Sequence, residues 1–369
     1  MAKRRLGIIG CGQLSQMLGE AANRLGYTVS YLCVDETPVV SGLGSIFYPE
    51  QLDAFLSHCD AITVERESLP DEMLRSAAKI GLAPGYEALV VLRERDTQKS
   101  MLDRLNIPTS PWSLVSSPDQ LREALKSLPT AYARCKRTLG GYDGGGQWRI
   151  DSNSLDLIPN DAFPIIAEAE VEIDCEYAII IGRDVSGRTA CYPMTENVMR
   201  DGILIGSYVP SGIEPSLAEQ AAEYANRLVN AMDYIGVLAI EFFLTDGQLI
   251  VNEIAPRVHN TGHWTIGALG ADQFTQHVGC VMGESVRESQ LEGGASMINL
   301  LDNRLPAKMP DEPVRSLIQT YGKGVRKGRK LGHITLIGPD AAEVKAKAAQ
   351  LITELHGVQR ILRSSPAVE

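Results

Sequence analysis

The sequence has no Cys-x-x-Cys pair and no apolar run long enough to cross a membrane. Its seven cysteines are scattered along the chain, and their odd number fits neither a disulfide framework nor a zinc knuckle. The apolar stretch at residues 6–9 (LGII) is too short for a signal peptide or a membrane span. These absences predict a reduced, cytoplasmic protein with no membrane partner.

Positive charge is also scarce. The chain has 46 Asp and Glu against 35 Lys and Arg, a net charge of −11, whereas proteins that bind nucleic acid in bulk are usually basic. Low-complexity segments are missing, and 44% hydrophobic and 22% charged residues are typical of a globular protein. We therefore expect no nucleic-acid partner, and 369 residues are enough for two or three domains.

The first segment alternates between strand and helix patterns. Residues 6–34 read as an apolar strand, a glycine turn, an amphipathic helix and a second strand, which predicts a parallel sheet. The turn, Gly10-x-Gly12-x-x-Ser15, lacks the third glycine of the dinucleotide fingerprint, although Asp35 lies where a ribose-binding acid would be expected. We favour a helix N-terminus that binds an anion or polar ligand; an NAD-dependent oxidoreductase is the weaker alternative.

A glycine-rich loop lies in the second segment of the chain. Residues 138–150 (TLGGYDGGGQWRI) hold five glycines around a Tyr-Asp pair, between two strand-like segments. A phosphate-binding loop usually carries a cation among its glycines, but here the nearest are Lys136 and Arg137, just upstream. The residues alone fit both an interdomain linker and a loop that closes over a ligand.

Two glutamates lie on an apolar hairpin that turns at Asp246-Gly247. A three-residue loop would place Glu241 opposite Glu253, whereas a two-residue loop would place Asn252 there. Facing carboxylates repel each other unless a cation lies between them. Hard oxygen ligands of this kind suit Mg²⁺ that bridges nucleotide phosphates.

The segment APRVHNTGHW follows the hairpin directly. Glu253 would, in the plainer alternative, only form a salt bridge with Arg257. His259 and His263 are four residues apart, but the Asn-Thr-Gly between them is expected to break helix geometry, so we expect no zinc site. Arg257, His259 and Asn260 are better interpreted as a group that binds an oxyanion, and His263 as part of a buried polar network.

A dense basic run, YGKGVRKGRKLGH, lies near the C-terminus. It resembles a nucleic-acid or heparin patch, and a solvated face is the common alternative. In an acidic chain, the run fits a small phosphorylated substrate at least as well. Its cations are Lys323, Arg326, Lys327, Arg329 and Lys330.

Taken together, these pieces resemble the ATP-grasp superfamily, and within it the N5-carboxyaminoimidazole ribonucleotide synthetase family. The motifs that carry the resemblance are GCGQLSQML, RDTQKSML, KRTLGGYDGGGQW, YPMTENVMRDGIL, VNEIAPRVHNTGHWT and YGKGVRKGRKLGH. The implied fold is α/β: a Rossmann-like parallel-sheet (preATP-grasp) domain at 1–95, a small α+β lid subdomain at 96–170, and a C-terminal α+β catalytic domain at 171–369. The basic segment from about 300 belongs to the last of these.

The resemblance implies an ATP-dependent ligase of purine biosynthesis, a homodimer that uses Mg²⁺. Bicarbonate and ATP would form carboxyphosphate, and the amine of 5-aminoimidazole ribonucleotide would capture the carboxyl group, with ADP and phosphate released. Another ATP-grasp ligase that activates formate, or a non-catalytic nucleotide-binding paralogue, are the alternatives. No Ser-His-Asp or Cys-His grouping is expected, because attack on a γ-phosphate needs cations more than a nucleophile.

The resemblance also implies roles by position. ATP is assigned to Arg95 and Lys136, to the lid residues Gly141, Tyr142, Asp143, Gly144, Gly145, Gly146 and Gln147, to the backbone of Glu168, Ala169, Glu170 and Val171 around adenine, to Glu176 at the ribose, and to Met199, Asn252 and Glu253. Mg²⁺ is assigned to Glu241 and Glu253. Bicarbonate and carboxyphosphate are assigned to Arg257, His259 and Asn260, which with Lys323 are the catalytic residues. The ribonucleotide is assigned to Gln13, Leu14, Tyr142, Asp143, Arg257, Lys323, Arg326, Arg329 and Lys330.

Two positions depart from the family pattern. Gly145 stands where the family usually has a basic lid residue, and Met199 stands where it usually has histidine. Both family residues are implicated near the nucleotide, so ATP affinity is expected to be weaker unless another cation, such as Arg137, substitutes. A lid with glycine at this position is expected to be unusually mobile.

Overall fold

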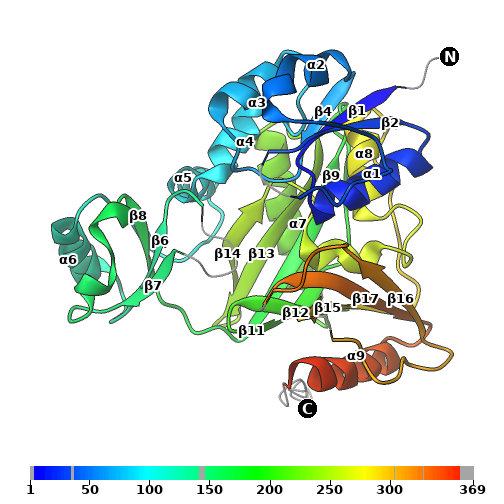
Figure 1. Ribbon diagram of the computed structural model, residues 1–369. Helices are drawn as coiled ribbons and strands as arrows, with labels where there is room; N and C mark the ends of the chain where they lie inside the picture. Colours follow the sequence, from blue (N-terminus) through cyan, green and yellow to red (C-terminus); the bar gives the residue numbers. More distant parts are fainter. Residues whose placement is uncertain (1–3, 35–36, 141–145, 303, 327, 358–369) are drawn as a thin grey trace.

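The computed structural model describes residues 4–34, 37–140, 146–302, 304–326 and 328–357. Within these residues the strands form three sheets, which Figure 1 shows as an N-terminal part at the top, a small module at the side and a large central sheet. The α/β architecture, with a parallel N-terminal sheet, is confirmed. No helix in the described ranges has the length and apolarity to span a membrane.

The N-terminal part is a four-stranded parallel sheet in the order β3-β2-β1-β4. The predicted helix after the glycine turn is α1. Apolar residues of β1, β2, β4 and α3 form the core on one face of this sheet. Its elements are β1 (Arg5–Ile9), α1 (Gln13–Arg24), β2 (Thr28–Leu32), β3 (Ser45–Phe47), η1 (Pro49–Gln51), α2 (Leu52–Ser57), β4 (Ala61–Val64), α3 (Asp71–Ala78) and α4 (Tyr86–Arg93).

A glutamate side chain of the same domain occupies the glycine turn before α1. The carboxylate of Glu65 accepts hydrogen bonds from the backbone of Gly12 (2.7 Å) and Leu14 (3.1 Å) and from the Ser15 hydroxyl (2.8 Å). A Cβ added at Gly12 would lie 2.5 Å from this carboxylate, so a larger residue there would have to displace Glu65. The N-terminus of α1 therefore does bind an anion, as its glycines indicate, but that anion is a side chain of the same domain.

The second part is a four-stranded sheet in the order β5-β8-β6-β7, covered on one face by α6. Ser117 caps α6 by accepting a hydrogen bond from Gln120 N. β6 and β7 form a hairpin whose connection contains the glycine loop, but residues 141–145 lie outside the described residues. The elements are α5 (Arg95–Arg104), β5 (Trp112–Val115), α6 (Pro118–Ser127), β6 (Ala133–Arg137), β7 (Gln147–Ile150), η2 (Leu155–Leu157), η3 (Asn160–Ala162) and β8 (Ile165–Ala169).

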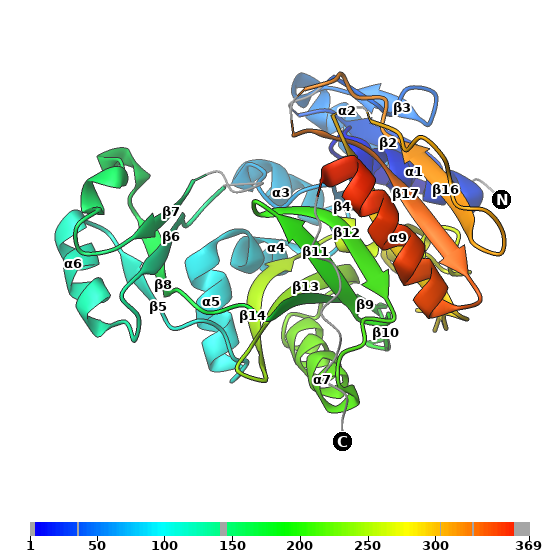
Figure 2. The same ribbon diagram turned by 90° about the horizontal axis from the view of Figure 1, so that it is seen from below.

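The large sheet follows the order β14-β13-β9-β11-β12-β15-β17-β16, with β10 paired to β9. α9 packs against β12, β15 and β17, whereas α7 packs against β9 and β14 at the other part of the sheet; Figure 2 shows α9 lying across β12 and β17, and α7 beside β9 and β13. The elements are β9 (Cys175–Arg183), β10 (Thr189–Cys191), β11 (Thr195–Arg200), β12 (Ile203–Val209), α7 (Pro215–Ala231), β13 (Gly236–Thr245), β14 (Gln248–Ala255), η4 (Asn260–Thr265), α8 (Gln273–Val281), β15 (Gly294–Leu301), β16 (Arg315–Thr320), β17 (Lys330–Gly338) and α9 (Ala341–His356).

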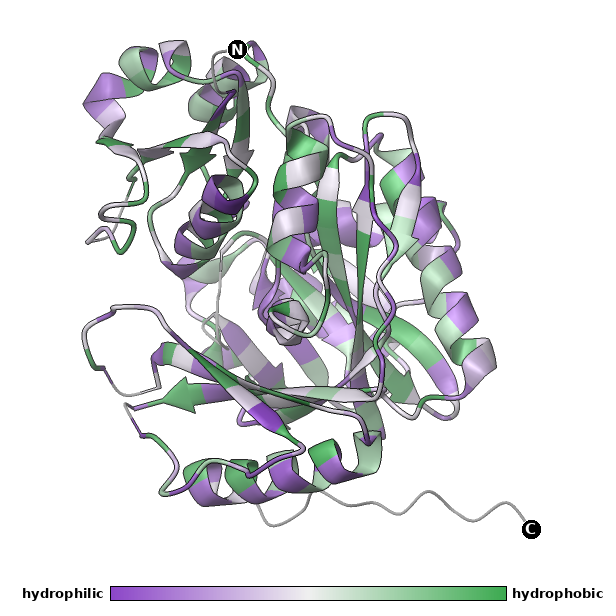
Figure 3. Ribbon diagram, turned by 90° about the vertical axis from the view of Figure 1, so that its right-hand side faces the viewer, coloured by the Kyte–Doolittle hydropathy of each residue, from purple (hydrophilic) through white to green (hydrophobic). Residues whose placement is uncertain are grey.

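Both faces of the central strands are covered, which fits their nearly continuous apolar sequence. Ile179 and Ile240 face α7, whereas Ile180 and Ala239 face the core shared with α1, α8 and η4. In Figure 3 the strands are largely apolar, whereas the outer helices alternate between polar and apolar residues. The predicted metal ligands Glu241 and Glu253 lie on the second face.

Candidate active site

Three glutamates share one face of the large sheet. Side chains directly opposite each other on paired strands point the same way, and the register pairs Glu241 with Glu253 and Phe243 with Glu176. Glu241 and Phe243 are two residues apart on β13 and so also share a face. The register therefore places Glu176, Glu241 and Glu253 together, on the face opposite α7.

The hairpin brings Glu253 opposite Glu241 through a β-bulge that the sequence did not predict. Its loop has two residues, Asp246 and Gly247, since Thr245 pairs with Gln248. Both loop residues have positive φ, 48° and 73°. A two-residue loop was expected to bring Asn252 opposite Glu241, but a β-bulge after Glu241 shifts the register by one residue and brings Glu253 there instead.

The shared face is strongly acidic. Burial, together with the neighbouring charges of Glu253 and Glu176, raises the pKa of Glu241 to about 8, although Lys330 and Arg257 oppose this shift. Burial raises the pKa of Glu176 to about 7. Within the described residues no three His, Cys, Asp or Glu side chains have the spacing of a complete metal cage. The facing pair can therefore offer two oxygen donors to a cation whose other ligands come from a substrate.

Arg257 and His259 lie just beyond β14, beside these glutamates. Arg257 donates from Nε to Glu67 Oε2 at 2.9 Å, which joins the large sheet to the N-terminal part. His259 Nε2 lies 3.8 Å from Glu241 Oε1. The Asn-Thr-Gly that follows was expected to break helix geometry; this is wrong, because residues 260–265 form the 3-10 helix η4.

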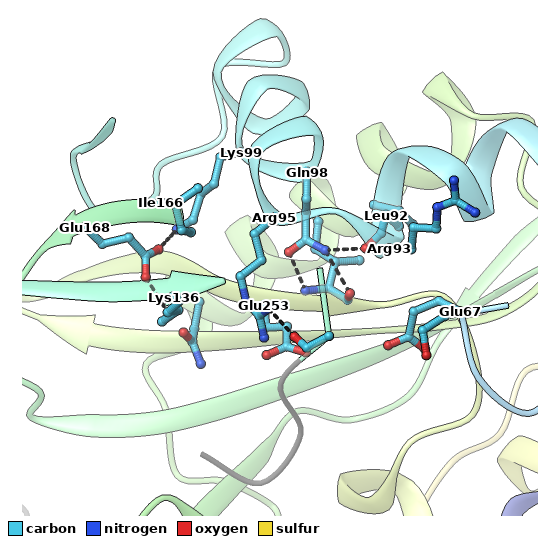
Figure 4. Close-up of a pocket in the computed structure, with 14 residues that line it drawn as sticks. Glu67, Leu92, Arg93, Arg95, Gln98, Lys99, Lys136, Ile166, Glu168 and Glu253 are labelled. Atoms are coloured by element: carbon cyan, nitrogen blue, oxygen red, sulfur yellow. Dashed lines mark hydrogen bonds and ion pairs between the residues drawn. The ribbon is translucent and has the colours of Figure 1, made fainter. Parts of the chain in front are cut away.

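A cleft with basic and acidic walls lies between the small sheet and β14. Figure 4 shows Lys99 and Lys136 on the two sides of the Glu168 carboxylate. Lys136 Nζ lies 2.5 Å from Glu168 Oε2, and Lys99 contacts the other oxygen. Burial alone would raise the pKa of Glu168, but Lys136 and Lys99 together outweigh it and lower the pKa to about 2. The cleft thus holds two cations for one buried anion, an excess that suits a phosphate ligand.

Arg95 fixes the base of the glycine loop. Its guanidinium donates to the carbonyl oxygens of Arg137 (2.9 Å) and Gly140 (2.5 Å), and its backbone N–H donates to Thr138 O (2.9 Å). After the loop, the carbonyl oxygen of Gly146 accepts a hydrogen bond from the backbone N–H of Arg137. These contacts fix Gly140 and Gly146, the described residues on either side of the loop, while residues 141–145 lie outside the described part of the chain.

The remaining nucleotide assignments occupy several elements. Glu170 turns its carboxylate to Arg134 and Arg149 at the surface, which fits a role for its backbone alone. Asn252 and Glu253 line the cleft with Lys136. The other positions are Gln147 at the start of β7, Ala169 at the end of β8, Val171 in the link to β9, and Met199, half-buried on β11.

The basic run connects β16 to β17, and Lys330 is the first residue of β17. Arg329 Nη1 donates to Gly324 O at 3.3 Å within this connection. Lys323 and Arg326 lie on the same connection, whereas Lys327 lies outside the described residues. Lys330 is close enough to the acidic face to oppose the raised pKa of Glu241. Gln13 and Leu14 begin α1, where the backbone of Leu14 is held by Glu65.

The chain is 38% identical over 356 residues to an N5-carboxyaminoimidazole ribonucleotide synthase of Brucella melitensis, and the match covers 90% of this chain and 96% of that protein. The chain belongs to this family. Family models match as a ribonucleotide synthetase preATP-grasp domain (residues 3–93), an ATP-grasp domain (100–274) and a phosphoribosylaminoimidazole carboxylase C-terminal domain (295–347). Arg95, Lys136 and Glu253 of this family member line one cleft. Glu241 faces Glu253 and lies 3.8 Å from His259 Nε2, and the ligand roles of these residues stay predictions.

Solved structures of the family agree with this assignment. A synthetase from Thermus thermophilus superposes with a TM-score of 0.86 at 32% identity, covering 98% of this chain and 99% of that one. A synthase from Aspergillus clavatus, in complex with ADP and 5-aminoimidazole ribonucleotide, gives a TM-score of 0.84 at 25% identity, covering 96% and 99%.

The sequence patterns did not identify the residues that position the predicted site residues through hydrogen bonds and ion pairs. Lys99 forms an ion pair with Glu168. The side-chain amide of Gln98 hydrogen-bonds to both the backbone carbonyl and the backbone N–H of Ile254, next to Glu253. Gln273 likewise pairs with both backbone groups of His259. The one available signal was two polar residues, Gln98 and Lys99, in a helix whose neighbours Met101 and Leu102 are core residues.

Proposed function

We propose that this chain catalyses the ATP-dependent carboxylation of 5-aminoimidazole ribonucleotide by bicarbonate, with release of ADP and phosphate. The observation that carries the proposal is the pairing of Glu241 with Glu253 in register, directly beside Arg257 and His259 and facing the cleft of Lys136. This arrangement supports a site in which carboxylate oxygens bind a cation, Arg257 and His259 bind an oxyanion, and Lys136 binds phosphate. The Aspergillus clavatus complex supports the same pair of ligands, because it holds ADP and the aminoimidazole ribonucleotide.

The chemistry proceeds in two transfers. An oxygen of bicarbonate attacks the γ-phosphorus of ATP, the bond to ADP breaks, and carboxyphosphate forms. The exocyclic amine of the ribonucleotide then attacks the carboxyl carbon, loses a proton, and phosphate leaves. The roles proposed for this chain are that Lys136 binds the nucleotide phosphates and that Arg257 and His259 bind the bicarbonate oxygens. Negative charge develops on these oxygens in both transition states, so preorganised donors are the main catalytic device.

Magnesium fits the donor set of the shared face. Burial raises the pKa of Glu241 and repulsion by Glu253 adds to the shift, and a divalent cation bound by both carboxylates would offset that repulsion. The same two carboxylates would then hold Mg²⁺, which would neutralise charge on the bound phosphates. His259, held neutral because burial lowers its pKa, would donate or accept a hydrogen bond there without adding charge.

The reaction is tested by measuring ADP release with each substrate omitted in turn. We expect release that depends on bicarbonate and is stimulated by aminoimidazole ribonucleotide. Release that depends on formate would support the formate-activating alternative. ATP binding without phosphate release, in the presence of both substrates, would support the non-catalytic paralogue.

The basic connection before β17 is proposed to bind the phosphate of the ribonucleotide. Replacement of Lys323 by alanine is expected to raise the KM for aminoimidazole ribonucleotide about tenfold or more, because a charge-assisted contact to phosphate contributes about 1.5 to 3 kcal/mol. The KM for ATP should change much less. Steady-state kinetics of Lys323→Ala measure both, with Lys308→Ala as control, because Lys308 is an exposed lysine that pairs at the surface with Asp311. An equal rise in both KM values would contradict the assignment.

The proposal extends to the setting of the reaction. All seven cysteines lie in the described part of the chain and none is in a disulfide there, which supports a reducing, cytoplasmic location. We also propose a homodimer, in line with the family resemblance. Sedimentation of the purified protein tests the oligomeric state.

A further inference from the structure

His263 is a completely buried histidine beside the proposed bicarbonate group, with no role in the chemistry above. Its exposed fraction is 0%, and its ring lies 4.9 Å from the ring of His333 and 5.5 Å from that of Phe274, centroid to centroid. His333 in turn bonds through Nδ1 to the Tyr321 hydroxyl at 2.8 Å. Burial lowers the pKa of His263 well below its ordinary value, and the neighbouring ionisable groups of His333, His259, Lys330 and Arg257 lower it further, so the ring is neutral.

The neighbouring Gln273 fixes which ring nitrogen carries the proton. Its Oε1 accepts from the backbone N–H of His259 (2.9 Å), and its Nε2 donates to the backbone carbonyl of His259 (2.7 Å). A backbone N–H can only donate and a carbonyl can only accept, so the amide has one possible orientation. Gln273 Nε2 lies 3.0 Å from His263 Nδ1, which must therefore accept. The proton of the neutral ring is on Nε2.

This Nε2–H is a buried donor with no hydrogen-bond partner among the described residues, and both amide atoms of Asn260 are in the same condition. The two residues are three apart in the 3-10 helix η4, where side chains at i and i+3 eclipse each other, so they share a face. An unsatisfied buried polar group costs about 1 to 3 kcal/mol, and native structures seldom retain two side by side without a ligand or water.

His277 shows what a purely structural buried histidine looks like in this chain. It is 1% exposed, its Nε2 bonds to Thr63 Oγ1 at 2.7 Å, and its Nδ1 accepts from Val237 N at 2.9 Å. Both ring nitrogens are satisfied. His263, in contrast, leaves its Nε2–H donor without a partner among the described residues.

We propose that His263 donates its Nε2–H to an oxygen of the carbonate-type anion, bicarbonate and then the carboxyl end of carboxyphosphate, next to the Asn260 amide. This inference rests on the proposed function and adds a substrate-binding residue to it. A carbonate-type ligand fits better than a phosphate. The pair offers two kinds of neutral donor and one amide acceptor, which match the oxygens and the O–H of bicarbonate, whereas the phosphates have cations at Lys136 and on the basic connection. Arg257, three residues before Asn260, supplies the positive charge.

The test replaces His263 by phenylalanine, which keeps an aromatic ring in the stack and removes both nitrogens. We expect kcat/KM for bicarbonate to fall about a hundredfold, as loss of one oxyanion donor does elsewhere. The KM for ATP and the Kd for ADP should stay within about twofold of wild type. His263→Gln, which can carry an N–H near the position of Nε2, should recover part of the loss and also serves if the phenylalanine variant does not fold.

The matched control is His277→Phe, which removes two satisfied nitrogens from an equally buried site outside the catalytic region. It should lose stability and keep the bicarbonate KM. Wild-type bicarbonate kinetics in both His263 variants, an equal loss of kcat/KM for bicarbonate in His277→Phe, or a loss confined to the KM of aminoimidazole ribonucleotide would each overturn the inference. Absence of bicarbonate-dependent ADP release in the wild type would instead overturn the proposed function, so the two failures are distinguishable.

Discussion

Replacing Glu253 by glutamine is expected to reduce phosphate release roughly a thousandfold or more while the fold stays intact. Glu253 faces Glu241 across β13 and β14, and glutamine has nearly the same shape but cannot supply an anionic ligand. A bound metal contributes several kcal/mol of charge stabilisation to phosphoryl transfer, and each 1.36 kcal/mol corresponds to a factor of ten in rate. Coupled ADP-release kinetics at saturating Mg²⁺ measure the loss.

The control is Asp246→Asn, which removes one carboxylate from the exposed turn of the same hairpin. Asn tolerates the positive φ of 48° at this position, so the turn should be retained. Its turnover should equal that of wild type. In addition, Glu253→Gln should lower the pKa of Glu241, because it removes a neighbouring negative charge. Normal phosphate release in Glu253→Gln would remove the metal assignment.

Replacing Glu168 by glutamine is expected to cost about 3 to 5 kcal/mol of unfolding free energy, the usual loss when one partner of a buried ion pair is removed. Two lysines depend on this carboxylate, and the exposed side-chain fractions are 3% for Lys99, 14% for Lys136 and 4% for Glu168. Glutamine leaves both ammonium groups without this counter-charge. The KM for ATP should rise as well, since Lys136 would no longer be held at the cleft wall.

The pH dependence gives this prediction its sharpest form. The pKa of Glu168 is about 2 in the folded protein, below the value of about 4.3 in an unfolded chain. Its contribution is therefore present above about pH 4.3 and is lost as pH falls toward 2. Urea unfolding of the wild type should show a steeper loss of stability in that interval than Glu168→Gln shows.

A surface carboxylate on the same segment serves as the control. Glu170→Gln removes a charge paired with Arg134 and Arg149, whose side chains are 51% and 46% exposed. Exposed ion pairs contribute about 0 to 1 kcal/mol, so its unfolding free energy should be close to wild type. Equal destabilisation by the two substitutions would show that Glu168 is not a buried electrostatic anchor.

The hairpin illustrates how far sequence patterns reach. Asp246-Gly247 and the flanking apolar residues were sufficient to predict two paired strands and a turn. They were insufficient to predict the register, because a β-bulge has no reliable local signature and shifts the facing residue from Asn252 to Glu253. The sequence left two alternatives open, Glu253 or Asn252 opposite Glu241, and only the observed strand pairing distinguished them.

The sequence alone determined the parallel N-terminal sheet and the family, because these depend on local periodicity and on motifs that are contiguous in the chain. The tertiary structure alone decided which distant groups complete each other. Glu65 fills the glycine turn of α1, Lys99 shares Glu168 with Lys136, and Gln273 sets the proton on His263. Such pairings depend on burial and on hydrogen-bond geometry between segments far apart in sequence, and no local pattern encodes them.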